Sequence, residues 1–214
     1  MSIPAPITAL HITALPTPAS IAMVAAFLAL VSRNGSLAGQ DLRGLDLRSQ
    51  DLRGRDLSGA NLSRHDLTGC VLTGANLRRA NLSGQNLRNR DLSGTVLTGA
   101  KLSGCLLAGA NLSRANLSRQ DLRNRDLSGC RMVAANLTGC VLAGANLTGA
   151  NLSGQDLRNR DLSGANLTGA DLTGCALAGC ALAGADLTGA NLSGQDLSNP
   201  DLSSFDPGPT SRSC

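Results

Sequence analysis

The residues of this sequence that could carry chemistry lie in a polar phrase that recurs every 35 residues. The ten residues Gln-Asp-Leu-Arg-Asn-Arg-Asp-Leu-Ser-Gly occupy 155–164, and nearly the same ten occupy 85–94 and 120–129. Two arginines close to a glutamine and an aspartate have the composition of a basic binding motif. Whether the phrase can act as one depends on the elements that position these side chains.

The other candidates for catalysis or metal binding are few. His11 and His65 are the two histidines, and neither belongs to a recognisable arrangement of nucleophile, base and partner. The sequence contains neither a phosphate loop nor a dinucleotide-binding fingerprint. Its cysteines follow no metal-ligand or disulfide spacing. We therefore expect no enzyme activity, no cofactor and no metal site.

A shorter period of five residues underlies the phrase and defines the fold. From Leu37 to Leu202 there are 34 positions spaced by five, of which 33 are leucine and one is Met132. Asp or Asn precedes this central residue in 25 of the 34 pentads, and Gly usually stands two positions after it. Neither a helix nor a strand repeats every five residues, so the period indicates a solenoid of stacked units. Glycine suits its corners, and Asn is the next most tolerant residue there, at Asn89, Asn124, Asn159 and Asn199.

These pentads resemble the pentapeptide-repeat family, whose consensus is close to A(D/N)LxG. Residues 165–174, ANLTGADLTG, match that consensus almost letter for letter. The resemblance implies an all-β fold, a right-handed quadrilateral β-helix with four pentads in each coil. Over residues 35–204 this fold would form about eight coils and a rod about 40 Å long. The central leucine and the small residue two positions before it would point inward.

The composition agrees with a solenoid filled by leucine. The chain has no Trp or Tyr, and its two phenylalanines are Phe27 and Phe205. Each buried leucine contributes roughly 1.5–3 kcal/mol, so a leucine stack needs no aromatic residues. Six of the seven cysteines take the small inward position, where we expect buried side chains: Cys70, Cys105, Cys130, Cys140, Cys175 and Cys180. A reducing, cytoplasmic environment fits this pattern best.

Two segments lie outside the repeat. Residues 1–34 form an N-terminal extension in which Thr17 and Pro18 are typical of a helix start, so we predict a helix over 18–32. This helix would cap the first coil and cover its open edges. The apolar run 19–31 is too short to span a bilayer, but an export or membrane signal, or disorder, remains an alternative. Residues 205–214 form a polar C-terminal tail.

In the five-residue frame, the polar phrase places glutamine and arginine at the small inward position. The pairs are Gln50 and Arg55, Gln85 and Arg90, Gln120 and Arg125, and Gln155 and Arg160. An arginine inside a leucine-lined rod costs several kcal/mol unless it is paired. Three interpretations are open: the corners bulge and release the side chains to solvent, the side chains form hydrogen bonds inside the coil, or they form a ligand site. Because a face recurs every 20 residues, copies spaced by 35 fall on different faces and form no straight basic stripe.

The charge is distributed unevenly along the rod. Residues 37–130 carry 14 Arg and Lys against 8 Asp, whereas residues 131–204 carry 3 Arg against 6 Asp. We expect a non-catalytic rod or scaffold that binds a protein, although the sequence does not identify the partner. The chain has no aromatic residues in the repeat on which bases could stack, so we expect no nucleic-acid binding.

Two alternative functions follow from the resemblance and the charge. Some members of the family bind DNA gyrase or topoisomerase IV as acidic mimics of duplex DNA and protect it from quinolones or toxins. The candidate protein-interaction residues would then be Asp156, Asp161, Asp171, Asp186, Asp196 and Asp201. The second alternative is a structural or envelope-associated homo-oligomer, in which oppositely charged ends stack on one another.

Overall fold

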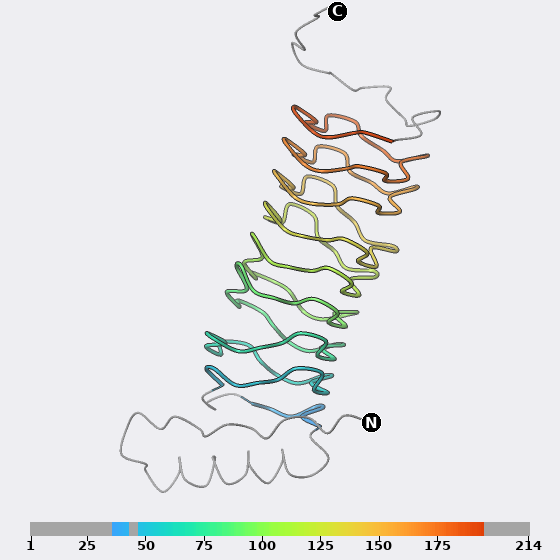
Figure 1. Ribbon diagram of the computed structural model, residues 1–214. Coiled ribbons are helices and arrows are strands. Elements are labelled where there is room, and N and C mark those ends of the chain that lie inside the picture. The colour runs from blue at the N-terminus through green and yellow to red at the C-terminus, as the bar shows by residue number, and fades with distance from the viewer. Residues whose placement is uncertain (1–35, 43–46, 195–214) are drawn as a thin grey trace, which may run out of the picture.

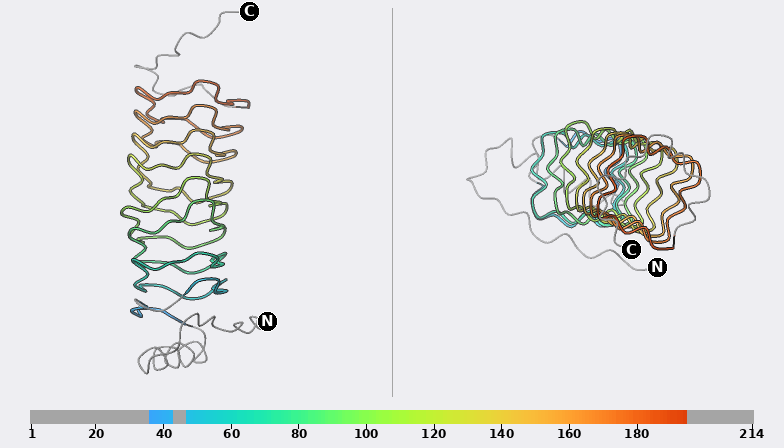
Figure 2. Two further views of the ribbon diagram at one scale, coloured as in Figure 1. Left: turned by 90° about the vertical axis from the view of Figure 1, so that its left-hand side faces the viewer. Right: turned by 90° about the horizontal axis from the view of Figure 1, so that it is seen from above.

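The chain forms a solenoid of stacked coils (Figure 1). The structure, a computed structural model, describes residues 36–42 and 47–194. Parallel bridges join residues 20 positions apart, from Ser36 with Asp56 to Asp171 with Asn191. One coil therefore takes four pentads, as predicted, and the described ranges form about eight coils. Figure 2 shows the resulting rod from a second side and from above.

The β structure of the rod consists of isolated bridges rather than continuous strands. Every described bridge involves residues directly before a central leucine or Met132, and a turn directly follows the central residue of each fully described pentad. Within 36–42 and 47–194 there is no helix, and so none that could cross a membrane. The predicted capping helix at 18–32, the apolar run 19–31 and the tail at 205–214 lie outside these ranges.

The backbone hydrogen bonds of a single pentad explain its sequence pattern. The Leu57 N–H donates to the Asn76 carbonyl of the coil above at 2.8 Å, and the Ala60 N–H closes the corner onto the Leu57 carbonyl at 3.0 Å. The Ser58 N–H, which the ladder does not satisfy, donates to the Asp56 carboxylate at 3.0 Å. Asp and Asn therefore recur before leucine because their side-chain oxygen accepts the N–H two residues later.

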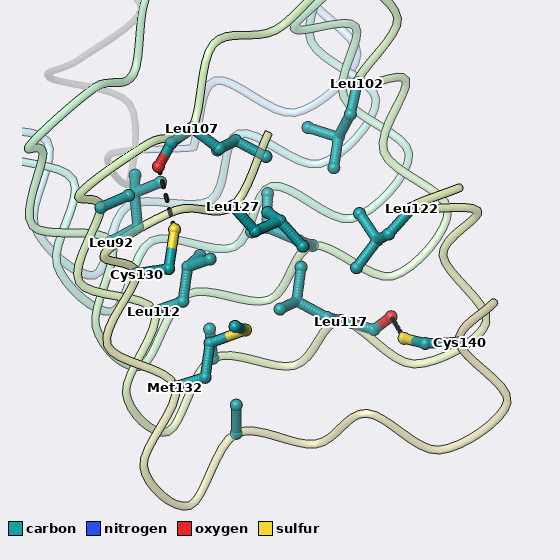
Figure 3. Packing of buried hydrophobic residues seen from close by; sticks show 14 of the residues in the cluster. Leu92, Leu102, Leu107, Leu112, Leu117, Leu122, Leu127, Cys130, Met132 and Cys140 are labelled. Atoms are coloured by element: carbon teal, nitrogen blue, oxygen red, sulfur yellow. Dashed lines mark hydrogen bonds between the residues drawn. The ribbon is translucent and has the colours of Figure 1, made fainter. Parts of the chain in front are cut away.

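The central side chains stack in four columns, as the period predicts, and fill the interior. Figure 3 shows Leu92, Leu112 and Met132, which occupy successive coils of one column. Leu112 and Met132 are 1% and 0% exposed. Methionine fits among leucines because its unbranched side chain adapts to the space available. The core is thus a continuous apolar stack along the rod.

The corners adopt the left-handed backbone conformation, as predicted. Asn89, Asn124 and Asn159 have φ values of 55°, 54° and 56°, which confirms that Asn replaces Gly there; Asn199 lies outside the described ranges. Four arginines, which the repeat pattern did not predict at corners, take the same conformation with φ between 58° and 63°: Arg64, Arg79, Arg114 and Arg119. This conformation costs roughly 1–2 kcal/mol for a residue with a β-carbon.

Candidate functional site

The bridges between coils are interrupted below three copies of the phrase, at 85–91, 120–126 and 155–161. Elsewhere in the described ranges, the residue before each central leucine pairs with its counterpart one coil above, giving 21 parallel bridges. The pairs that form no bridge are Asp66–Asn86, Val71–Asp91, Lys101–Asp121, Leu106–Asp126, Asn136–Asp156 and Val141–Asp161. In every one of them the upper residue belongs to the phrase. These three copies therefore open the ladder toward the coil below them, whereas Asp56 in the copy at 50–56 keeps its bridge to Ser36.

The glutamines of the phrase point inward and stay buried. Gln85, Gln120 and Gln155 are 2%, 6% and 4% exposed, and each amide nitrogen donates to a backbone carbonyl one coil below. The acceptors are Leu62, Leu97 and Met132, at 2.7, 2.5 and 2.5 Å. Hydrogen bonding inside the rod is therefore the correct interpretation for these glutamines, and a bulge into solvent is wrong for them. The bond offsets the cost of burying an amide.

The arginines of the phrase lie above cysteines. Arg90, Arg125 and Arg160 follow Cys70, Cys105 and Cys140 by 20 residues, and all three arginines are half-buried. The Nε atom of Arg160 is buried without a hydrogen-bond partner. Two neighbouring pentads thus place long side chains where the other coils mostly hold small ones. We attribute the opening of the ladder to this bulk, because a close-packed interior cannot absorb it.

The opening below 120–126 forms a depression on the surface. It has a volume of about 450 Å³ and lies between residues of 100–103 and residues of 120–125. Its polar lining consists of Lys101 and Ser103 below, with Gln120, Asp121, Asn124, Arg123 and Arg125 above. Three cations therefore surround one carboxylate. Lys101 is the single lysine of the chain.

The carboxylate in the depression is neutralised by its own pentad. Arg123 donates from Nε and Nη2 to the two Asp121 oxygens at 2.9 and 2.7 Å. This bond holds the pKa of Asp121 at about 2. The same pairing recurs in two other copies of the phrase, as Asp51 with Arg53 and Asp156 with Arg158. These exposed pairs contribute little to stability, but they cancel the charge of the aspartate.

The predicted acidic interaction residues do not gather on one face. Asp156, Asp161, Asp171 and Asp186 each occupy a different face of the four-sided coil, since a face recurs every 20 residues. Asp161 and Asp171 accept from the hydroxyls of Ser163 and Thr173 in their own pentads, and these bonds lower the pKa of both carboxyls. Asp196 and Asp201 lie outside the described ranges.

The thiols and the described histidine are occupied within the rod. The six described cysteines are buried and unpaired with one another, as predicted, and burial raises the pKa of Cys130 and of Cys180 to about 11. The sulfurs of Cys130 and Cys140 contact the Leu107 and Leu117 carbonyls (Figure 3). His65 likewise contacts the Leu42 carbonyl. Across the described residues, no three metal-ligating side chains come together.

Lys101 is a residue of the depression that the repeat pattern did not reveal as a candidate. The signal that could have found it is the coil length, because Lys101 lies 20 residues before the phrase residue Asp121. Lys101 also stands where 25 of the 34 pentads carry Asp or Asn. The depression thus combines an opening in the ladder with a charge that departs from the repeat.

Comparison with known proteins identifies the repeat. A family profile described as pentapeptide repeats matches 8 copies within 51–204. The solved structure of HetL, a pentapeptide repeat protein involved in heterocyst differentiation regulation in the cyanobacterium Nostoc sp. strain PCC 7120, is 30% identical. That match covers 83% of this chain and 96% of HetL, with a TM-score of 0.50.

Further similar structures share the repeat at lower similarity. QnrB1, a plasmid-mediated fluoroquinolone resistance protein, is 22% identical over 75% of this chain and 89% of its own, with a TM-score of 0.40. A thylakoid-lumen protein of Arabidopsis thaliana is 30% identical over 51% of this chain and 66% of its own, with a TM-score of 0.21. None of the curated proteins matches the sequence. The profile covers well over half of the residues, and the chain therefore belongs to the pentapeptide-repeat family.

Proposed function

We propose that this chain is a non-catalytic, right-handed rod that presents its outer faces to a protein partner in the cytoplasm. The observation that carries the proposal is the division between a filled interior and a polar exterior. Described central residues from Leu37 to Leu182 are buried, and the cysteines between them are buried as well. Catalysis needs a reactive side chain in a pocket, and the buried thiols do not provide one. Stacked repeats instead offer extended faces for binding.

The proposal predicts that one face contacts the partner more than the others. Photo-reactive residues can be placed singly at Thr98, Ser103, Ala108 and Ser113, which follow the central leucines of four successive pentads in one coil. After incubation with extract of the source cells, we expect one of the four variants to form a discrete cross-link that excess unlabelled protein removes. Equal cross-linking from all four positions, or products that the unlabelled protein does not remove, would contradict a partner-binding face.

The topoisomerase alternative depends on the acidic half of the rod. Asp161 and Asp186 are exposed, and hydrogen bonds lower the pKa of each, so both are ionised at neutral pH. Their placement on different faces, with Asp156 neutralised by Arg158, gives a much lower charge density than duplex DNA, which carries one charge per roughly 1.7 Å. We therefore expect weak or no protection of gyrase supercoiling against ciprofloxacin. Robust protection would promote this alternative to the leading function.

End-to-end assembly is testable separately. An attraction between oppositely charged ends would be screened over about 8 Å at physiological ionic strength. Sedimentation would then show a larger mass at low salt than at high salt. A single mass at both salt concentrations would exclude assembly through end charges.

A further inference from the structure

We propose that the depression at Lys101 binds a phosphate monoester through its doubly charged oxyanion. The depression lies in the opening between 100–106 and 120–126, where no bridge joins Lys101 to Asp121 or Leu106 to Asp126. Its volume of about 450 Å³ accommodates a phosphate group with a small organic substituent. The inference goes beyond the proposed protein-binding function and does not depend on it.

The charge of the depression favours an anion. The Asp121 carboxylate accepts two hydrogen bonds from Arg123, at 2.9 and 2.7 Å. Lys101 and Arg125 form no ion pair with any residue of the described ranges, and Arg125 interacts with Asp121 only through a weaker Coulombic attraction. The three cations Lys101, Arg123 and Arg125 against the one carboxylate give the lining a formal net charge of +2. Lysine and arginine are the side chains that bind phosphate oxygens.

The opening also leaves backbone donors without their usual acceptors. In the intact part of the ladder, Leu82 donates its N–H to the Lys101 carbonyl at 2.9 Å and Gly84 donates to the Ser103 carbonyl at 2.8 Å. The equivalent bonds one coil higher, from Leu102 to Asp121 and from Gly104 to Arg123, do not form. Leu102 lines the depression, so its N–H can donate to a bound oxyanion.

The combination is specific to one of the three openings. Asp66 and Asn136 occupy the place of Lys101 in the openings below 85–91 and 155–161. An aspartate there would repel an anion, and an asparagine offers no charge. The geometry therefore assigns one oxyanion site to the chain rather than three.

The site is tested by calorimetric titration of the full chain with glycerol phosphate at low ionic strength and pH 7.5, with glycerol as the uncharged control. We expect one binding event for glycerol phosphate and none for glycerol. At pH 5 the affinity should fall, because the second pKa of a phosphate monoester is about 6 and the ligand loses one charge. An absence of binding at pH 7.5, or equal binding of glycerol, would overturn the proposal.

Two variants separate the charge from the opening. Lys101→Asn restores the residue that the repeat normally carries and should weaken binding by roughly tenfold or more, the effect of losing a charge-assisted hydrogen bond. Gln120→Ala removes the inward side chain that replaces the ladder bond at the Ala100 carbonyl and leaves the charge of the depression unchanged. This variant should weaken binding although Lys101 and Arg125 are both retained.

The matched control is Arg131→Asn. Arg131 occupies the same position of its pentad as Lys101, but it bridges to both Asn111 below and Asn151 above, so its ladder is closed. The variant removes one positive charge and should leave the affinity within about twofold, since distant exposed charges are screened. An equal loss in Arg131→Asn and Lys101→Asn would show general charge attraction and overturn a discrete site.

Discussion

Gln120 lies one coil above Ala100, and its side-chain nitrogen lies 3.3 Å from the Ala100 carbonyl oxygen. In an intact coil that oxygen would accept a backbone N–H, as the Ala80 carbonyl does from Lys101 at 2.9 Å. The same Gln120 nitrogen also lies 2.5 Å from the Leu97 carbonyl. A side chain has thus taken the place of a ladder bond. The main structural effect of the polar phrase is therefore to interrupt the backbone hydrogen bonds between two coils.

Arg125→Ala tests whether the arginine of the phrase is a misfit. Arg125 is half-buried, and its side chain forms no hydrogen bond or ion pair within the described ranges that alanine would remove. We therefore expect the free energy of unfolding to stay the same or to rise by up to about 1 kcal/mol, as it does for consensus substitutions. Chemical denaturation measures the change. The reverse change, Ala115→Arg, forces an arginine into a closed part of the ladder and should cost about 1–3 kcal/mol. A loss above roughly 2 kcal/mol in Arg125→Ala would show a paired arginine instead.

Leu112→Asp tests the apolar core. Leu112 is 1% exposed in the middle of its column, so the variant buries an unpaired charge and should lose more than about 4 kcal/mol, or fail to fold. Asn116→Asp, at the outward position of the next pentad, introduces the same charge and retains an oxygen for the Ser118 N–H. That control should remain near wild-type stability in thermal unfolding followed by circular dichroism. Equal effects of the two changes would contradict the inward direction of residue 112.

Acid should destabilise the rod. The pKa of Asp121 and that of Asp156 lie at about 2 because Arg123 and Arg158 bond their carboxylates. A carboxyl whose pKa is lower in the folded chain stabilises the fold above its unfolded pKa of about 3.9, and this contribution disappears as the pH falls through the folded pKa. The melting temperature should therefore change little from pH 8 to 5 and fall only slightly between pH 4 and about 2, since both pairs are exposed to solvent.

Replacement by asparagine provides the control for the acid prediction. Asn still accepts the N–H two residues later, as Asn111 does from Ser113 at 3.1 Å, but it does not titrate. A variant with Asp121→Asn and Asp156→Asn should lose less stability between pH 4 and 2 than the wild type. An identical acid transition would show that these two carboxyls do not contribute to it.

Gly109 is predicted to be less replaceable than Gly149. Both corners have positive φ, so alanine is strained at each. A β-carbon on Gly109 would also overlap the side-chain oxygen of Asn89 one coil below, whereas one on Gly149 would meet nothing within 4 Å. Displacing Asn89 from its rotamer should add about 0.5–1.5 kcal/mol to the cost of Gly109→Ala. Denaturant unfolding measures both, and Asn89→Gly should remove the difference.

The sequence alone predicted most of the fold. The five-residue period placed the leucines inward, and Asn at 89, 124 and 159 was correctly assigned to the corners, because both follow from local backbone preferences. The 20-residue coil also correctly separated Arg90, Arg125 and Arg160 onto different faces.

The sequence could not predict how the backbone and side chains of one coil adjust to those of the next coil. The burial of Gln85 depends on the Leu62 carbonyl, which already accepts the His65 N–H at 3.4 Å but has a second lone pair to offer. The depression at Lys101 depends on the loss of ladder bonds above it, which no local pattern encodes. Both are consequences of packing across the 20-residue step.

Amide hydrogen exchange measured by NMR tests the opening of the ladder most directly. The N–H groups of Leu62, Leu97 and Met132 donate to the coil above at 2.9, 2.8 and 2.8 Å, and they should exchange slowly. Those of Leu67, Leu102 and Leu137, one pentad later, lack this bond and should exchange much faster, and Gln120→Ala with Arg125→Ala should slow the exchange at Leu102. Uniform protection of all six amides would contradict the conclusion that the polar phrase parts the coils.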